Sequence, residues 1–150
     1  MEKSQTNLNA VQRFYDAYNK KHEATLSEVI ADNYVDYGHE PPGRGLQGAK
    51  SDHQEFGRAF EDARFDIDEM FGSDDRVVVR WTVHGTHTGP FAGIPPTQKK
   101  ITVRGISLYR LLYGKITETR NLPDLLALFK QLGTIELKKS ATASIRASHS

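Results

Sequence analysis

Two long stretches in the second half of the chain alternate hydrophobic and polar residues with the period of a β-strand. Residues 76–87 (RVVVRWTVHGTH) place valines and Trp81 on one face and polar residues on the other. Residues 101–112 (ITVRGISLYRLL) are rich in β-branched and aromatic residues. Residues 115–122 predict a third strand, which Pro123 ends because proline cannot donate a ladder hydrogen bond. The pattern therefore predicts three long strands joined by short connections.

The first half of the chain predicts helices. Leu8, Val11, Phe14, Tyr15 and Tyr18 recur at helical spacing, which is typical of an amphipathic helix that covers a sheet. Further expected elements are a short helix near residues 26–30, a brief strand at 34–39, a loop at 43–48, a helix carrying His53, Phe56 and Phe60, and a strand at 65–71.

This order of elements predicts an α+β fold, because the long strands follow one another without helical crossovers and so pair antiparallel. The hydrophobic period stops after Gly133. We therefore expect a single domain over residues 1–133 and a flexible C-terminal tail over 134–150, whose composition offers little apolar surface to bury.

Composition narrows the function classes only modestly. With 20 basic and 19 acidic residues the net charge is +1, which gives no indication of a nucleic-acid partner or an anionic membrane surface. The chain has no cysteine, so disulfides and cysteine-ligated metal centres are excluded. No apolar run is long enough to span a membrane and no hydrophobic signal region opens the chain, so a cytoplasmic protein is the expectation.

Two apparent motifs have simpler explanations. GRGLQG at 43–48 matches the glycine pattern of dinucleotide-binding loops, but that motif requires a parallel strand before it, so turn-forming glycines are favoured. His84 and His87 are three residues apart on a predicted strand and point to opposite faces, so they cannot share a metal ion. We therefore expect no metal site and no cofactor.

Several polar residues remain open to two interpretations. His53 lies on an apolar helical stripe, which favours a hydrogen-bonded core histidine over a pocket residue that orients a substrate oxygen. Arg80 and Arg104 sit in mid-strand, where pairing with Asp66 or Asp68 is favoured. The apolar loop at 88–97 either packs on the sheet edge or forms a lid or partner surface.

Asp124 stands between a strand and an apolar helix. An aspartate at a helix start usually caps free amides. The alternative is catalytic, because neighbours such as Leu122, Leu125 and Leu126 would remove water from the carboxylate and raise its pKa toward the range of a general base.

Three segments resemble the SnoaL-like polyketide cyclase (ester cyclase) family: GTHTGPFAGIPPT at 85–97, YRLLYGKITE at 109–118 and PDLLALFKQLG at 123–133. The similarity continues upstream to about Leu8 and excludes the tail. It implies the cone-shaped fold of the nuclear-transport-factor-like superfamily, in which three to four helices wrap a strongly curved antiparallel or mixed sheet around a deep pocket.

The resemblance also implies chemistry. Characterised cyclases of the family close a ring by intramolecular aldol condensation without metal or cofactor, and their acid/base aspartate matches Asp124. The pocket residues expected on this basis are Tyr37, His39, His53, Trp81 and Arg104. Where family members commonly carry histidine or another polar residue followed by tryptophan, this chain has Thr119 and Arg120; Tyr37 replaces a further histidine, for which His39 is a possible substitute.

Three functions follow from these observations. The first is a cofactor-independent cyclase, isomerase or lyase acting on a hydrophobic carbonyl compound, and the second is a non-catalytic small-molecule binding protein with the same pocket. The third is an adaptor that uses the open sheet as a partner surface. Because three short helices cannot cover all the apolar sheet surface, we expect a homodimer through the sheet.

Overall fold

The alternating stretches form strands of one sheet in the computed structural model, which describes residues 2–136 and 138. In chain order the elements are α1 (Glu2–Asn19), the 3-10 helix η1 (Glu23–Thr25), α2 (Leu26–Val29), β1 (Ile30–Asp36), β2 (Gly43–Arg44), α3 (Gly45–Ala59), β3 (Arg64–Ser73), β4 (Arg76–Thr86), β5 (Lys100–Leu112), β6 (Lys115–Pro123) and α4 (Leu125–Leu132). Apart from residues 134–136 and 138, the predicted tail lies outside the described residues.

The six strands form one mixed sheet in the order β2-β1-β6-β5-β4-β3. The long strands β3 to β6 pair antiparallel, as their short connections predict. By contrast, β1 pairs in parallel with the edge of β6 that β5 leaves free, with Asp36 opposite Thr119. This pairing brings the end of β1 to the middle of a strand that follows it by some eighty residues in the chain.

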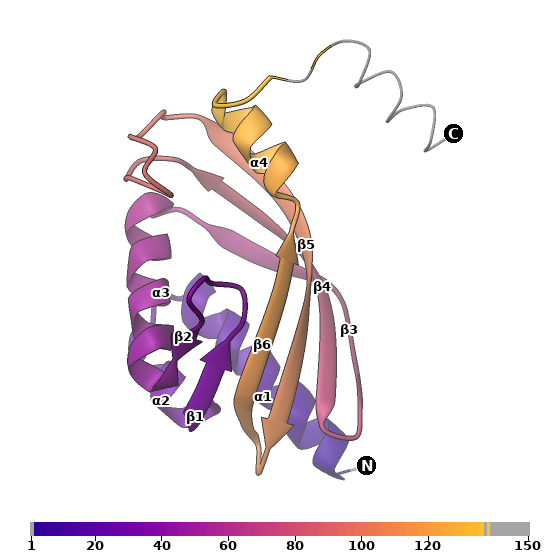
Figure 1. The fold of residues 1–150 in the computed structure, drawn as a ribbon. Helices are drawn as coiled ribbons and strands as arrows, with labels where there is room; N and C mark the ends of the chain where they lie inside the picture. Colours follow the sequence, from indigo (N-terminus) through magenta and orange to yellow (C-terminus); the bar gives the residue numbers. More distant parts are fainter. Residues whose placement is uncertain (1, 137, 139–150) are drawn as a thin grey trace, which may run out of the picture.

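Figure 1 shows the helices on one side of a bent sheet. Helix α1 contacts β3, α3 contacts β1, and α4 contacts β5 where the sheet ends. The predicted α+β class and the cone-like wrapping of a curved sheet by helices are therefore confirmed. Within the described residues, no helix combines the length and the apolar character needed to cross a membrane.

The inner face of the sheet supplies the core. Along β5 buried and exposed residues alternate over nearly its whole length, and Val77, Val79 and Trp81 of β4 are buried on the same side. The period-2 pattern in the sequence thus identified the inner face correctly. Tyr15 and Val11 of α1 close over it, as expected for the apolar stripe of an amphipathic helix.

The segment at 43–48 differs from the expected loop. Gly43 and Arg44 form a two-residue strand antiparallel to β1, and α3 already begins at Gly45. Gly45 has a φ of +68°, a conformation that glycine adopts without a steric cost, so the chain can turn directly from strand to helix. A dinucleotide-binding motif would have a parallel strand directly before its glycines. Here the antiparallel pair of β1 and β2 occupies that position.

The two histidines at the end of β4 lie in different environments. His84 Nε2 is 3.1 Å from Asp66 Oδ2 at the sheet surface. His87 is fully buried beside the Phe60 ring, and its Nδ1 accepts a hydrogen bond from the Thr97 backbone N–H at 3.2 Å. The two side chains therefore share no site, as their opposite directions on the strand predicted. His87 instead connects the two ends of the apolar loop at 88–97 through its contacts with Thr97.

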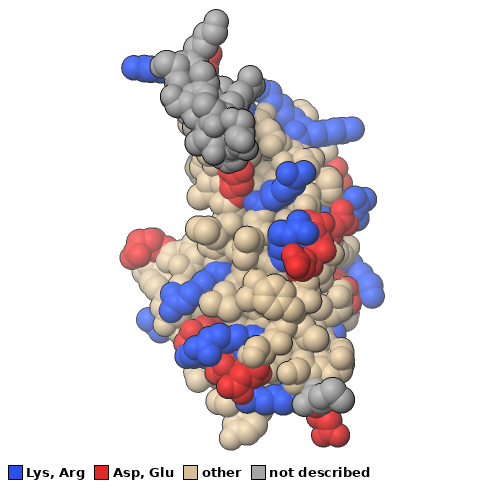
Figure 2. All heavy atoms as spheres, turned by 90° about the vertical axis from the view of Figure 1, so that its right-hand side faces the viewer, with Lys and Arg blue, Asp and Glu red and all other residues tan. Residues whose placement is uncertain are grey.

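The outer face of the sheet carries an exposed apolar patch. Ile106 of β5 and Leu122 of β6 are direct cross-strand neighbours and are 50% and 77% exposed. Arg80 lies opposite Ile106 on β4. It pairs with Asp68 at 3.7 Å, one of the two predicted partners, and also with Glu69 at 3.4 Å. Figure 2 shows uncharged side chains on this face between clusters of charged ones.

We expect this outer face to form the interface of a homodimer, because an exposed apolar patch with a charged rim is typical of self-association. Sedimentation velocity at micromolar concentration should show a dimer, and Ile106→Lys combined with Leu122→Lys should shift it to monomer. Tyr113→Lys is the control, since Tyr113 is 95% exposed at the tip of the β5–β6 turn. A monomer of the unaltered chain would refute the prediction.

A second prediction concerns the contact between Trp81 and Gly105. A Cβ at Gly105 would lie 2.2 Å from Cζ2 of Trp81, so Gly105→Ala should displace the indole and lower the free energy of unfolding by about 1–3 kcal/mol. Gly57→Ala is the matched control, because a Cβ there meets no atom within 4 Å and removing a glycine from a helix should stabilise by about 0.5–1 kcal/mol. Urea titrations of both variants would test this difference, and equal stabilities would contradict it.

Candidate functional site

A cavity of about 900 Å³ lies between the inner face of the sheet and the helices. Its apolar lining comes from helices, strands and the loop after β4: Phe14, Phe56, Phe60, Phe65, Trp81, Val83, Pro90, Phe91, Ile101, Val103, Leu125 and Leu128. The apolar loop therefore forms part of the wall, with Phe91 packed on Phe60 at a ring distance of 5.3 Å. A cavity of this size and lining suits a flat, largely aromatic or alicyclic ligand.

Buried phenols provide polar groups inside this apolar cavity. The hydroxyls of Tyr15 and Tyr109 are 2.7 Å apart, and Tyr34 donates to Thr119 Oγ1 at 2.9 Å. Burial raises the pKa of Tyr15 to about 12 and also raises the pKa values of Tyr34 and Tyr109. These phenols therefore stay protonated near neutral pH and act as hydrogen-bonding groups rather than as bases.

A chain of three hydrogen-bonded side chains crosses the inner face of the sheet from β4 to β6. Trp81 Nε1–H donates to Ser107 Oγ at 2.9 Å, and the Ser107 hydroxyl donates to Asn121 Oδ1 at 2.5 Å. All three residues line the cavity. The inner wall thus combines aromatic surface with a few fixed polar atoms, which is the usual composition of a small-molecule site.

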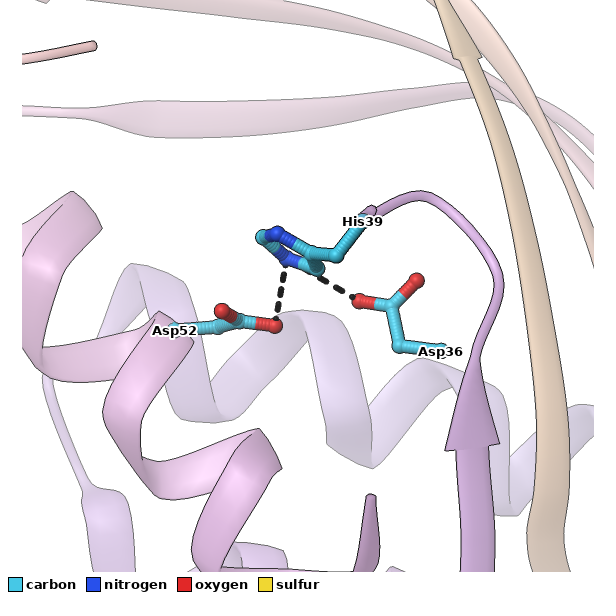
Figure 3. Close-up of side chains that lie close together, drawn as sticks. All are labelled: Asp36, His39 and Asp52. Atoms are coloured by element: carbon cyan, nitrogen blue, oxygen red, sulfur yellow. Dashed lines mark hydrogen bonds and ion pairs between the residues drawn. The ribbon is translucent and has the colours of Figure 1, made fainter. Parts of the chain in front are cut away.

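Three ionisable side chains converge on the cavity wall: Asp36, His39 and Asp52. Asp36 ends β1, His39 lies in the turn that follows, and Asp52 projects from α3. His39 Nε2 is 2.9 Å from Asp52 Oδ2 and 3.4 Å from Asp36 Oδ2, so the imidazole lies between the two carboxylates (Figure 3). Asp36 is further held by the Gly38 backbone N–H, which donates to Oδ1 at 2.7 Å.

The environment of Asp52 gives this cluster acid/base character. Burial raises the pKa of Asp52 to about 6, the neighbouring Asp36 adds to the increase, and His39 opposes it. The carboxylate is therefore ionised at neutral pH but holds its proton far better than an ordinary aspartate. Such a group can accept a proton from a weak acid and return it within one catalytic cycle.

The same three side chains have a spacing that a cation could use. One ligand atom from each lies within 4.8 Å of the others, and two carboxylates with one imidazole are ligands that divalent metal ions accept. In the described arrangement both carboxylates already engage the same imidazole nitrogen. The contact with Asp52 is a hydrogen bond and the contact with Asp36 is a longer ion pair.

The pocket residues expected from the sequence are only partly brought together. His39 and Trp81 line the cavity. His53, in contrast, is buried on α3, where its Nε2–H donates to the Ala17 carbonyl at 2.8 Å and its ring packs on Tyr18. It is the hydrogen-bonded core histidine that the apolar helical stripe favoured.

Tyr37 and Arg104 lie outside the cavity lining. Tyr37 is 43% exposed beyond the end of β1, with the Arg120 guanidinium 4.2 Å from the centre of its ring. Arg104 occupies an exposed position on β5, because it follows buried Val103 and the side chains of a strand alternate between faces. The structure therefore does not bring these two side chains together with His39 and Trp81.

Asp124 is an N-cap of α4, with its Oδ1 accepting from the Ala127 backbone N–H at 3.0 Å. The side chain is exposed and is not part of the cavity lining. Leu122, Leu125 and Leu126 are themselves exposed, so the dehydrated environment expected around this carboxylate is not found. The capping interpretation accounts for its geometry, and its catalytic role stays a hypothesis.

Sequence reasoning did not single out Asp36, Asp52, Ser107 or Asn121. Asp52 immediately precedes His53 on α3, so the pattern that drew attention to the helix concerned the neighbouring residue. An available signal was an aspartate, Asp36, inside the strand predicted at 34–39, because aspartate is uncommon in strands. Its partner on α3 could be found only from the fold.

Comparisons with known proteins agree with this architecture. The family model described as SnoaL-like polyketide cyclase matches residues 9–132. Aklanonic acid methyl ester cyclase DnrD of Streptomyces peucetius is 30% identical over 132 residues, covering 85% of this chain and 91% of that protein.

Solved structures show the same fold. TsrD from Streptomyces laurentii has a TM-score of 0.82 at 24% identity, covering 87% of this chain and 97% of that one. IdmH from Streptomyces antibioticus has a TM-score of 0.73 at 28% identity, covering 85% of this chain and 98% of that one. Together with the family match over most of the folded domain, these similarities show that the chain belongs to the SnoaL-like polyketide cyclase family.

Proposed function

We propose that this protein closes a ring in a hydrophobic carbonyl compound by an intramolecular aldol-type reaction, without a cofactor, and that Asp52 is its acid/base. The observation that carries the proposal is the convergence of Asp52, His39 and Asp36 on the wall of the large aromatic cavity. Proton abstraction next to a carbonyl needs a base positioned beside the bound substrate, and the cluster places one on the wall of a largely apolar cavity.

The proton transfers balance within one turnover. Ionised Asp52 removes a proton from a carbon between two carbonyl groups, and the electron pair moves into the substrate as an enolate. The enolate carbon then attacks a second carbonyl of the same molecule, so that a carbon–carbon bond forms and an alkoxide appears. Protonated Asp52 returns its proton to the alkoxide. His39 and Asp36 keep the carboxylate in place and set its proton affinity.

The size and lining of the cavity indicate the substrate class. Phenylalanine side chains from α1, α3 and β3 line it, and buried phenol hydroxyls supply partners for oxygen substituents. A fused aromatic polyketide with an ester or ketone side chain fits these properties. Aklanonic acid methyl ester, named as the substrate of the curated relatives, is accordingly the first compound to assay.

A chromatographic assay of that ester, with and without a chelator, would test the reaction. Ring closure that the chelator leaves unchanged is the expected result. Chelator-sensitive turnover would assign the cluster to metal binding instead. Saturable binding without turnover of this or related esters would support a non-catalytic binding protein, the alternative that the same cavity allows.

The pH profile provides a sharper prediction. Because Asp52 must be ionised to accept a proton and its pKa is about 6, turnover should fall as the pH drops through about 6 and should level off above it. An unperturbed aspartate would place this limb near pH 4. A profile that is flat between pH 5 and 7, on a confirmed substrate, would contradict the role of Asp52.

Asp52→Asn should lower turnover by about 10²–10⁴, since the amide cannot accept the proton, while ligand binding and unfolding free energy change little. The same substitution at Asp124 is both the matched control and the test of the competing hypothesis. Asp124→Asn should leave turnover intact because asparagine also caps helices, whereas Asp124→Ala should cost about 1 kcal/mol of unfolding free energy. Loss of turnover in Asp124→Asn alone would reverse the assignment.

A further inference from the structure

The direction of the hydrogen bonds from Trp81 to Asn121 is determined by donor chemistry. An indole N–H can only donate, so Ser107 Oγ is the acceptor of the 2.9 Å bond from Trp81 Nε1. The Ser107 hydroxyl then gives its own hydrogen to Asn121 Oδ1, at 2.5 Å. Because the carbonyl side of the Asn121 amide faces Ser107, the Nδ2 side faces away from it.

The Asn121 amide nitrogen lies on the side of Gly38 and Asp36. Nδ2 lies 3.4 Å, and Asp36 Oδ1 3.0 Å, from the point that a Cβ on Gly38 would occupy. The amide N–H₂ group and Asp36, one member of the acid/base cluster, are therefore both close to Gly38. Among the described residues no side-chain hydrogen bond uses Nδ2, whereas Oδ1 is engaged.

We propose that Asn121 Nδ2 donates a hydrogen bond to the carbonyl oxygen of the substrate and stabilises the enolate that forms there. This inference rests on the proposed cyclase function and assigns it an oxyanion-stabilising residue. As Asp52 takes the proton from carbon, negative charge develops on the adjacent oxygen, and a donor already held in position stabilises that charge without reorganising. No proton leaves Asn121. Ser107 and Trp81 act as positioning residues that hold the amide in the donating orientation.

The cavity contains its own reporter for a binding test. Trp81 is the only tryptophan in the chain and lines the cavity, so a ligand that enters should quench its fluorescence. Anthraquinone and anthracene share a ring skeleton and differ in two carbonyl oxygens. The ratio of their dissociation constants therefore measures recognition of the carbonyl separately from burial of the rings.

Asn121→Leu should weaken anthraquinone binding about tenfold and leave anthracene binding unchanged, because it removes one hydrogen bond and keeps the volume. Asn33→Leu, the same substitution at an exposed residue of β1 outside the cavity lining, should change neither constant. Ser107→Ala should weaken anthraquinone binding in the parent chain but have no further effect in the Asn121→Leu background. Additive losses in that double variant would contradict the positioning role.

Steady-state kinetics provide a second test of Asn121. On a confirmed substrate, Asn121→Leu should lower kcat by about 10²–10³ with a smaller change in KM, since charge on the oxygen is largest in the transition state. An unchanged anthraquinone-to-anthracene ratio in Asn121→Leu would overturn the assignment of Asn121. A wild-type protein without turnover would refute the cyclase function alone, because the binding ratio still decides whether Nδ2 recognises a carbonyl oxygen.

Discussion

The close contact between Trp81 and Gly105 shapes the cavity. Since Gly105 has no Cβ, the indole occupies the space against β5 and presents its ring to the cavity. In this position its N–H reaches Ser107, which in turn holds Asn121. The absence of a side chain at Gly105 therefore fixes the position of Trp81. The position of Trp81 in turn fixes the polar groups that line the cavity.

The two aspartates considered for the catalytic role differ in their access to water. Asp52 is a partly buried residue of α3, where losing water costs more than the nearby imidazole restores, and its pKa rises. Asp124 stands at the surface, where its carboxylate accepts a hydrogen bond from the Ala127 backbone N–H as a helix cap. The two side chains are chemically identical but differ in access to water, and on this difference we base the proposal that Asp52 is the acid/base.

Much of the fold could be predicted from the sequence, whereas much of the candidate site could not. The alternation in β4 and β5 and the stripe of α1 reflect local rules, since side-chain direction follows backbone period. The same alternation gives the outward position of Arg104, whereas the family resemblance suggested Arg104 and Tyr37 for the pocket. A resemblance indicates which segment lies near a pocket but not which way each side chain turns.

The sequence by itself determined most of the elements and the α+β class, because hydrophobic period, proline and glycine signals act over a few residues. Three sequence segments carried the resemblance to the family. Only the tertiary structure decided which polar groups meet. Asp36 reaches the cavity because β1 pairs in parallel with β6. Asp52 meets Asp36 because α3 packs against β1. Asn121 joins them from β6. These contacts depend on strand order and helix packing, which no local pattern encodes.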